Sequence, residues 1–250
     1  MPTRKTWRTK ELDHKIKRCI LSYQARNGLE LGITQTGGGQ ITVNGFRFPY
    51  IEYDEGSYIA IRGRLTKTYK PCFVLFIEKD NTAVLDNVEN SKCSLDEDAE
   101  SKHAAKAAFA IAKEKGVSRI YLTDNSSKQI TPDNKFYLSD MYFLTTGQTW
   151  YESFLPIHLD KSEGIPIDSW REIVRTNIWT SVFNNLKRKH PDLTVPIDIS
   201  DIDPVAPGSA IKVLNRIKDA KTDFFVRYKL NLPGASDIVS LRGTLWIAEL

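Results

Sequence analysis

Hydrophobic and polar positions alternate over the first third of the chain, with the period of two that is typical of β-strands. Glycine-containing turns interrupt the alternation at Gly37–Gly39, Asn44–Gly45 and Asp54–Gly56. The intervening segments predict strands over residues 29–35, 40–44, 46–53, 57–63 and 72–78, with a further short strand at 82–88. Because short turns of this kind join antiparallel neighbours, the pattern predicts an antiparallel β-meander.

The period becomes helical after residue 100. Ala104, Ala107, Ala108 and Ile111 recur at helical spacing, and Gly116 follows where a helix C-cap is expected. A short apolar run, 117–123, then predicts a buried strand, and a loop, a second helix and an aromatic segment follow it. A helix that leads directly into a strand indicates the return half of an α/β unit.

The chain beyond residue 155 predicts a loop, helices and two more strands. An amphipathic pattern predicts one long helix from Ser169 to His190, capped by Asp168, and a short helix over 210–220. Strands are expected at 224–230 and 238–247. Residues 198–204 lack the central glycine and the distal glutamate of an EF-hand, so we interpret them as a turn-rich linker.

These elements predict an α/β (α+β) fold in three parts. Residues 1–28 form a basic arm and an amphipathic helix over Lys10 to Arg26, and residues 29–155 form the meander with its helix-strand-helix. Residues 156–250 form a helical and strand region that completes or flanks this domain.

The three consecutive glycines at 37–39 allow two interpretations. Glycine lets backbone amides approach an anion, as in a phosphate loop. Such a loop opens onto a helix and carries a lysine, whereas this one opens onto a predicted strand. We therefore expect a hairpin turn here.

Composition limits the class of protein. The chain has 250 residues, of which 41% are hydrophobic and 26% charged, as in globular domains. No run reaches the roughly 20 apolar residues of a membrane span, and the basic N-terminus does not resemble a secretory signal. The net charge of +4 does not by itself indicate nucleic-acid binding.

Cysteine and histidine spacing predicts neither a disulfide framework nor a metal site. Cys19, Cys72 and Cys93 are far apart and odd in number, and the four histidines form no ligand motif. We therefore expect free thiols, an intracellular reducing compartment such as the cytoplasm, and no metal.

The order of the central segments resembles that of the N-acetyltransferase superfamily. Residues 110–123, AIAKEKGVSRIYLT, are similar to its central helix and following strand, and residues 147–154, GQTWYESF, to the late segment where a tyrosine and a phenylalanine close the domain. The resemblance covers residues 40–155 and implies an acetyltransferase-like fold. Residues 138–152 also resemble uncharacterised proteins of large DNA viruses, which implies a virion or minor capsid component.

One departure from the superfamily concerns the cofactor. Its members present backbone amides of a glycine-rich turn to the pyrophosphate of acetyl-coenzyme A, at the N-terminus of the central helix. The corresponding turn here has no glycine and carries Asp96, Glu97, Asp98 and Glu100. Since like charges about 4 Å apart cost about 1 kcal/mol even in water, we expect no acetyl-coenzyme A at this turn and no other cofactor.

Three residues are candidates for catalysis if the protein is an enzyme. Tyr151 stands where the superfamily keeps a tyrosine that protonates the leaving thiolate, and Glu78 or Asp124 could be a general base. An enzyme also requires a cleft between the strand that ends near Glu78 and the strand 120–123. The alternatives are a core contact for Tyr151 and solvated or capping carboxylates. We expect His103 on the surface.

The basic arm indicates a partner of opposite charge. Residues 1–18 contain seven Lys or Arg and two acidic residues, although a solvated tail would share this composition. Arginine and aromatic side chains often anchor interfaces. The candidate partner-binding residues are Arg4, Lys5, Trp7, Arg8, Lys10, Trp170 and Trp179.

Three functions remain open on these grounds. The first is a non-enzymatic structural protein that contacts protein partners in an assembly. The second is a divergent N-acetyltransferase. The third is a nucleic-acid-binding protein that uses the arm together with Lys187, Arg188 and Lys189.

Overall fold

The computed structural model of the protein describes residues 34–54, 56, 58–64, 70–88, 93–124, 127–131, 134–220, 224, 241 and 243–250. The predicted arm, the helix over Lys10 to Arg26 and most of the strand 224–230 lie outside these residues. The chain divides into two compact units. The first comprises Met1–Leu122 with Glu249–Leu250, and the second comprises Thr123–Ala248. The division thus falls within the part that we expected to form one domain over 29–155.

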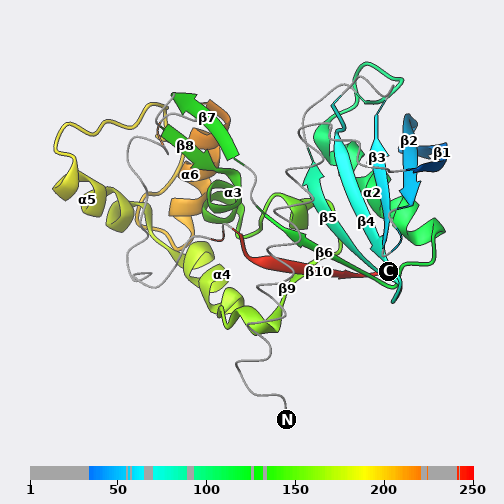
Figure 1. Ribbon diagram of the computed structural model, residues 1–250. Helices are drawn as coiled ribbons and strands as arrows, with labels where there is room; N and C mark the ends of the chain where they lie inside the picture. Colours follow the sequence, from blue (N-terminus) through cyan, green and yellow to red (C-terminus); the bar gives the residue numbers. More distant parts are fainter. Residues whose placement is uncertain are drawn as a thin grey trace, which may run out of the picture. The chain divides into compact units, whose positions relative to one another are not determined.

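The first unit contains the predicted meander (Figure 1). Its strands are β1 (Thr34–Val43), β2 (Phe46–Asp54), β3 (Tyr58–Gly63), β4 (Phe73–Glu78) and β5 (Thr82–Val88). Each strand pairs antiparallel with the next. Asn44 and Gly45 turn the first hairpin with φ of 52° and 84°, which is the backbone conformation of a type I′ turn.

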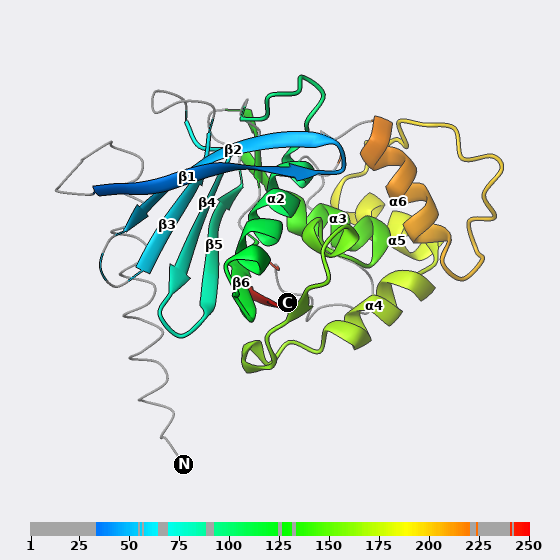
Figure 2. The ribbon, with the colours of Figure 1, turned by 90° about the vertical axis from the view of Figure 1, so that its right-hand side faces the viewer.

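The predicted α/β return follows the meander. Helix α2 (Ser101–Glu114) packs against the strands, and Gly116 follows it with φ of 75° (Figure 2). The alanines of α2 are buried, which lets the helix backbone lie close to the sheet. Strand β6 (Arg119–Thr123) then pairs parallel with β5. The helix-strand prediction is therefore confirmed.

The three glycines form no turn, which corrects our prediction. Gly37, Gly38 and Gly39 lie inside β1 and pair with residues 50–52 of β2. A Cβ on Gly38 would meet the backbone oxygen of Tyr50 at 2.8 Å, so the two strands approach too closely there for any side chain. Gly38 thus serves strand packing.

A disulfide joins Cys72 and Cys93, and both residues are buried. Their Cα atoms lie 5.8 Å apart, in the normal range for a disulfide, although the residues are separated by 21 positions. Our prediction that all cysteines remain free is therefore wrong for this pair, because the fold brings together side chains that are distant in sequence.

The second unit is mainly helical. It begins with a hairpin of β7 (Ser127–Thr131) and β8 (Asn134–Tyr137), where we expected a loop. Its helices are α3 (Leu138–Thr146), α4 (Ile167–Thr176), α5 (Trp179–Lys189) and α6 (Ser209–Ala220). Two 3₁₀ turns (Tyr151–Ser153 and Lys161–Glu163) and the strands β9 (His158–Leu159) and β10 (Leu245–Glu249) complete the described elements.

The predicted long helix over Ser169 to His190 is two helices. The backbone leaves α4 at Asn177, where ψ is 139°, and α5 begins at Trp179. Hydrogen bonds with the start of α6 stabilise the chain between the two helices. The N–H of Trp179 donates to Ser209 Oγ (2.8 Å), and the N–H of Ala210 donates to Asn177 O (3.1 Å). Asp168 lies inside the first turn of α4 and does not cap it.

The apolar stripes of these helices form the core of the second unit. Trp170 and Trp179 are 4% and 3% exposed, and they pack with Met141, Phe143 and the apolar residues of α6. Their burial favours the core interpretation of the stripe, so we no longer propose them as anchors for a partner.

The described strands of the main sheet follow the order β1-β2-β3-β4-β5-β6-β10-β9. The fold is thus mixed α/β, with a mostly antiparallel sheet of eight strands and five helices among the described residues. No helix in this part of the chain is long and apolar enough to cross a membrane.

Candidate functional site

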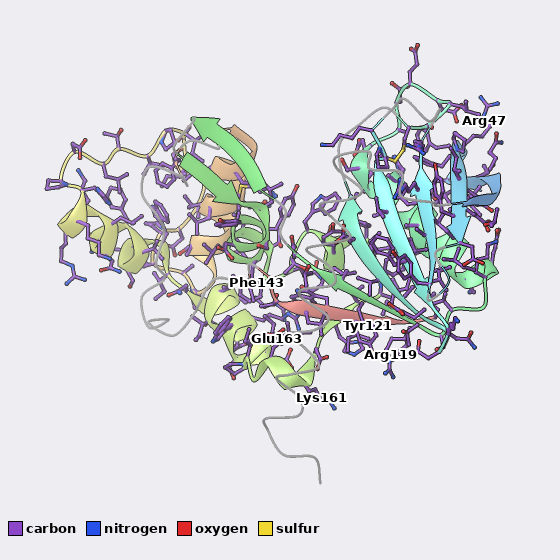
Figure 3. All side chains as sticks on the ribbon, in the orientation of Figure 1. Arg47, Arg119, Tyr121, Phe143, Lys161 and Glu163 are labelled. Carbon is purple, nitrogen blue, oxygen red and sulfur yellow. A yellow bond between two sulfur atoms is a disulfide. The ribbon has the colours of Figure 1, made fainter. Side chains whose placement is uncertain are left out.

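The turn before α2 is the place where the family resemblance would put a cofactor. Its first carboxylate, Asp96, is held by Arg47 of β2. Figure 3 labels the side chain of Arg47. The N–H of Arg47 donates to Asp96 Oδ2 (2.6 Å) and its Nη2 donates to Oδ1 (2.9 Å). The hydrogen bonds from Arg47 hold the pKa of Asp96 below its usual value. Asp96 is therefore a paired structural carboxylate.

The end of this turn is closed by its own residues. The N–H of Glu100 donates to Nδ1 of His103 (3.1 Å), and the N–H groups of His103 and Ala104 both donate to Glu100 O (2.9 and 3.3 Å). The carboxylate of Glu100 forms an ion pair with Lys102 (2.9 Å). Arg47 and Lys102 thus neutralise two of the four carboxylates that we expected to repel a diphosphate.

His103 does not lie on the surface as we expected. Its side chain is buried and stacks on the ring of Phe46, with 4.3 Å between the ring centroids. Burial lowers the pKa of His103, and the nearby Lys102 lowers it further. Because Nδ1 accepts a hydrogen bond, the neutral imidazole carries its proton on Nε2. The residue acts as a helix cap.

An anion fits poorly at this turn for two reasons. The backbone amides of Glu100, His103 and Ala104 are occupied within the chain, and the exposed carboxylates of Glu97 and Asp98 remain at the helix N-terminus. A pyrophosphate would need free amides and a positive field there. The residues present therefore do not fit acetyl-coenzyme A.

The structure brings two of the catalytic candidates into electrostatic contact. Asp124 is fully buried, Tyr151 is 7% exposed, and both belong to the second unit. Burial raises the pKa of Tyr151 well above its usual value, and the charge of Asp124 raises it further. A general acid works best when its pKa lies near the ambient pH. The environment of Tyr151 therefore favours the core contact over proton transfer.

The third candidate, Glu78, lies at the end of β4, opposite Tyr58 of β3. Strand β5 runs between β4 and β6 and pairs with both. Among the described strands, β5 thus occupies the place where we expected a cleft between the strand of Glu78 and the strand 120–123.

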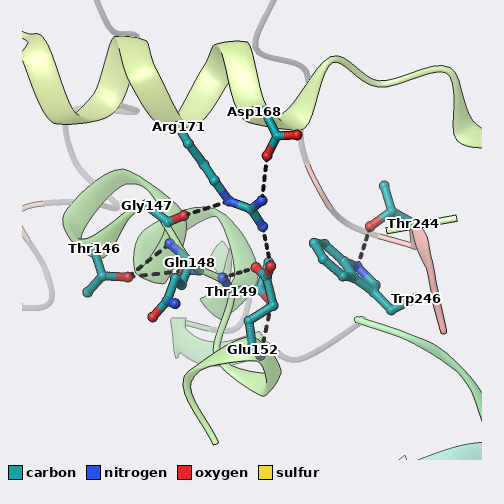
Figure 4. A network of polar contacts seen from close by, with 9 residues as sticks. All are labelled: Thr146, Gly147, Gln148, Thr149, Glu152, Asp168, Arg171, Thr244 and Trp246. Atoms are coloured by element: carbon teal, nitrogen blue, oxygen red, sulfur yellow. Dashed lines mark hydrogen bonds and ion pairs between the residues drawn. The ribbon is translucent and has the colours of Figure 1, made fainter. Parts of the chain in front are cut away.

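A network of polar contacts fixes the turn that carries Tyr151 (Figure 4). The carboxylate of Glu152 accepts a bond from the N–H of Thr149 (2.8 Å) and forms an ion pair with Arg171 of α4. Arg171 also donates to Gly147 O (3.2 Å) and to Asp168 (2.8 Å). Sequence analysis missed this network, because no motif links residues 147–152 to α4.

The aromatic segment forms a compact group beside this network. The ring of Trp150 packs edge-on against Tyr151 and Phe154, with centroids 4.8 and 4.7 Å apart. Trp150 and Phe154 are half-buried. The segment therefore serves packing of the second unit, as the core alternative for Tyr151 predicts.

The residues proposed for binding fall into two groups. Arg4, Lys5, Trp7, Arg8 and Lys10 lie outside the described residues. In α5, Arg188 and Lys189 are exposed, while Lys187 donates to Pro191 O (2.9 Å).

Neither metal-binding residues nor similarity to known proteins points to a functional site. No group of three His, Cys, Asp or Glu side chains within the described ranges could hold a metal ion. Comparison with protein-family models, with curated proteins and with solved structures gave no match to this chain.

Proposed function

We propose that the chain is a non-enzymatic interaction protein built on an acetyltransferase-like fold. The arrangement of the turn before α2 carries the proposal, because the turn has four carboxylates and no glycine, and because the amide of Glu100 already donates to Nδ1 of His103. The order of meander, α2, β6 and later α3 supports the fold assignment, since this is the order on which the resemblance rests. The virion setting is a proposal drawn from the viral resemblance alone.

Calorimetric titration of the full chain with acetyl-coenzyme A tests this proposal. We expect no binding at concentrations up to the millimolar range, which corresponds to a binding free energy weaker than about −4 kcal/mol. Binding at micromolar strength would overturn the proposal and restore an enzymatic reading.

A matched variant distinguishes two reasons why acetyl-coenzyme A would not bind, namely occupied amides and repulsion by carboxylates. Glu97→Gln with Asp98→Asn removes the two carboxylates that have no ion-pair partner among the described residues and leaves the bonds of Asp96 and Glu100 intact. If occupied amides exclude the cofactor, this variant also fails to bind. If it binds, charge alone excludes the cofactor, and the argument from the amides is wrong.

A divergent N-acetyltransferase is a second candidate, favoured by one observation. The parallel ladder between β5 and β6 ends at Leu85 and Leu122, although β5 continues to Val88. A register shift in β4·β5 places Asp86 as an extra residue immediately after this point. An acetyltransferase would have to hold its ligand at this end of β5, beyond the last residue pair with β6.

Acetyl transfer to a panel of amines tests this second candidate. If the protein is an acetyltransferase, the wild type releases free thiol, and Tyr151→Phe lowers kcat because the phenol proton is lost. Thiol release that is unchanged in Tyr151→Phe would remove Tyr151 from the mechanism. No thiol release from the wild type would remove the candidate itself.

A further inference from the structure

Strand β1 lies at the end of the main sheet, where Figure 1 shows it outermost in dark blue. Within the described part of the chain it pairs with β2 alone. It is ten residues long, which is long for an edge strand. An edge of this kind presents a row of backbone groups that can pair with another chain.

The sequence of β1 lacks the usual protection of an edge strand. Proteins commonly blunt such edges with charged side chains or proline, and Thr34–Val43 contains neither. Its register shift lies between Gln35 and Gly37, so the strand is regular from Gly37 to Val43. The regular part is therefore open to pairing along its whole length.

The geometry of the hairpin decides which backbone groups point outward. In a two-residue hairpin the pair next to the turn, here Val43 and Phe46, exchanges backbone bonds, and bonded pairs then alternate along the ladder. The N–H and C=O groups of Gly38, Gln40 and Thr42 accordingly point away from β2. All three residues are exposed.

The glycines remove the steric barrier to a second strand. Gly38 and Gly39 are exposed and carry no side chain that could shield the backbone edge. Packing against β2 explains Gly38, but a Cβ on Gly37 would meet only the side chain of Glu52, at 3.5 Å. Strand packing thus does not require all three glycines.

We propose that β1 pairs with β1 of a second copy of this chain, antiparallel and about a two-fold axis near Gln40. Such an axis places Gly38 opposite Thr42 and Gly39 opposite Ile41 of the other copy, so that the regular part of the strand pairs with itself. A charged strand would place like charges close together across the axis, whereas β1 has no charge to repel its own copy. The absence of charge therefore favours self-pairing over a partner chosen by its charge.

Self-pairing would make a second copy one partner of the proposed interaction protein, so it rests on the proposed function. An experiment can nevertheless contradict self-pairing without contradicting the proposed function. A chain that is monomeric and binds no acetyl-coenzyme A would overturn self-pairing and leave the proposed function standing. Because one short strand buries little area, we expect a weak dimer that forms at high local concentration.

Light scattering coupled to size exclusion, over a range of concentrations, measures the dimer directly. The test variant is Gln40→Lys with Thr42→Lys, which places two charges on the exposed edge. The control is Ser181→Lys with Thr194→Lys, which adds the same charge at two exposed positions of the second unit. We expect the test variant to weaken the dimer at least about tenfold and the control to match the wild type.

A second measurement remains valid if the lysine variant folds poorly. Hydrogen exchange of the amides of Gly38, Gln40 and Thr42 should slow as the wild-type concentration rises, while Gln40→Pro, which removes one outward N–H, should abolish this dependence. A wild type that is monomeric at every concentration, or a dimer unaffected by the edge variants, would overturn the proposal. Protection that appears only in a complex with another protein would place that protein on the edge and also overturn self-pairing.

Discussion

The guanidinium of Arg171 forms an ion pair with the carboxylate of Glu152, which joins α4 to the turn that carries Tyr151. The same guanidinium also pairs with Asp168 on the solvent side. The two carboxylates differ mainly in burial, since the side chain of Glu152 is 8% exposed and that of Asp168 is 90% exposed. One arginine thus provides a buried and an exposed ion pair for direct comparison.

We predict that Glu152→Gln lowers the free energy of unfolding by about 2 kcal/mol, because the partly buried guanidinium of Arg171 loses a buried, charged acceptor. Asp168→Asn should cost less than about 1 kcal/mol, because its ion pair is screened by water. Urea unfolding followed by tryptophan fluorescence measures both, since Trp150, Trp170, Trp179 and Trp246 all belong to the second unit. Equal losses of stability in the two variants would contradict the expectation that the buried ion pair contributes more than the exposed one.

We predict that the first unit loses stability as the pH falls below about 6.5, the ordinary pKa of histidine. Burial lowers the pKa of His103 in the folded state, so the unfolded state binds a proton first. The contribution is complete above the unfolded pKa and is lost as the pH falls toward the folded pKa. Protonation of Nδ1 also removes the acceptor for the N–H of Glu100.

His103→Gln is the control for this pH effect, because glutamine can accept the same bond without titrating. Urea unfolding at about pH 7.5 and about pH 5.5, followed by exchange of the α2 amides, compares the two proteins. The wild type should lose more stability than the variant. Parallel losses in both proteins would assign the pH dependence to other groups.

We predict that reduction of the Cys72–Cys93 disulfide destabilises the first unit by about 3 kcal/mol, because the unfolded chain regains the freedom of the closed loop. The measurement is the urea midpoint with and without a thiol reductant, in a Cys19→Ser background that prevents exchange with the third cysteine. Cys93→Ser should resemble the reduced protein and show no response to the reductant. A wild type that ignores the reductant would argue against the disulfide.

We predict that Gly63→Ala destabilises the first unit by about 1–3 kcal/mol through overpacking. A Cβ at this position would enter the ring of Phe73, which is fully buried on β4. Gly37→Ala is the matched control, with an expected change within about 0.5 kcal/mol, because its Cβ would meet only a flexible side chain. Thermal unfolding followed by circular dichroism distinguishes them, and a tolerated Gly63→Ala would show that Phe73 can repack.

The elements that sequence analysis predicted well depend on local patterns. The meander follows from a period of two with Asn44–Gly45 at the first turn, and α2 follows from its alanine spacing and Gly116. In each case the signals for the element and for its end lie within a few residues. Neighbouring strands of a meander also pair in sequence order, so no distant partner had to be identified.

The elements that it missed depend on distant partners. The break between α4 and α5 is held by Ser209 and Ala210, which the helical pattern of 169–190 does not include. The strand around Gly38 depends on its pairing with Ile51 of β2, whereas glycine alone suggests a turn. Cysteine spacing likewise carries no information about which thiols a fold brings together.

The candidate site was predicted less well than the fold. The turn before α2 is acidic, but Asp96 forms an ion pair with Arg47 and Glu100 forms one with Lys102. These ion pairs reduce the repulsion of a diphosphate that we expected. We expected His103 on the surface, whereas its side chain is buried and stacks on the ring of Phe46. The contacts of Arg47 with Asp96 and of Phe46 with His103 join β2 to residues about 50 positions later in the chain, and sequence patterns do not specify such pairs.

The last two residues of the chain belong to the first unit, although the whole second unit lies between them and Leu122. Glu249 accepts a bond from Arg119 (2.8 Å), and the N–H of Leu250 donates to Ser118 O (3.0 Å). During synthesis on the ribosome, β6 therefore cannot form these contacts until all of residues 123–248 have been synthesised. A nascent chain that stalls before β10 would leave β6 as an open edge, and this would make premature termination an aggregation hazard.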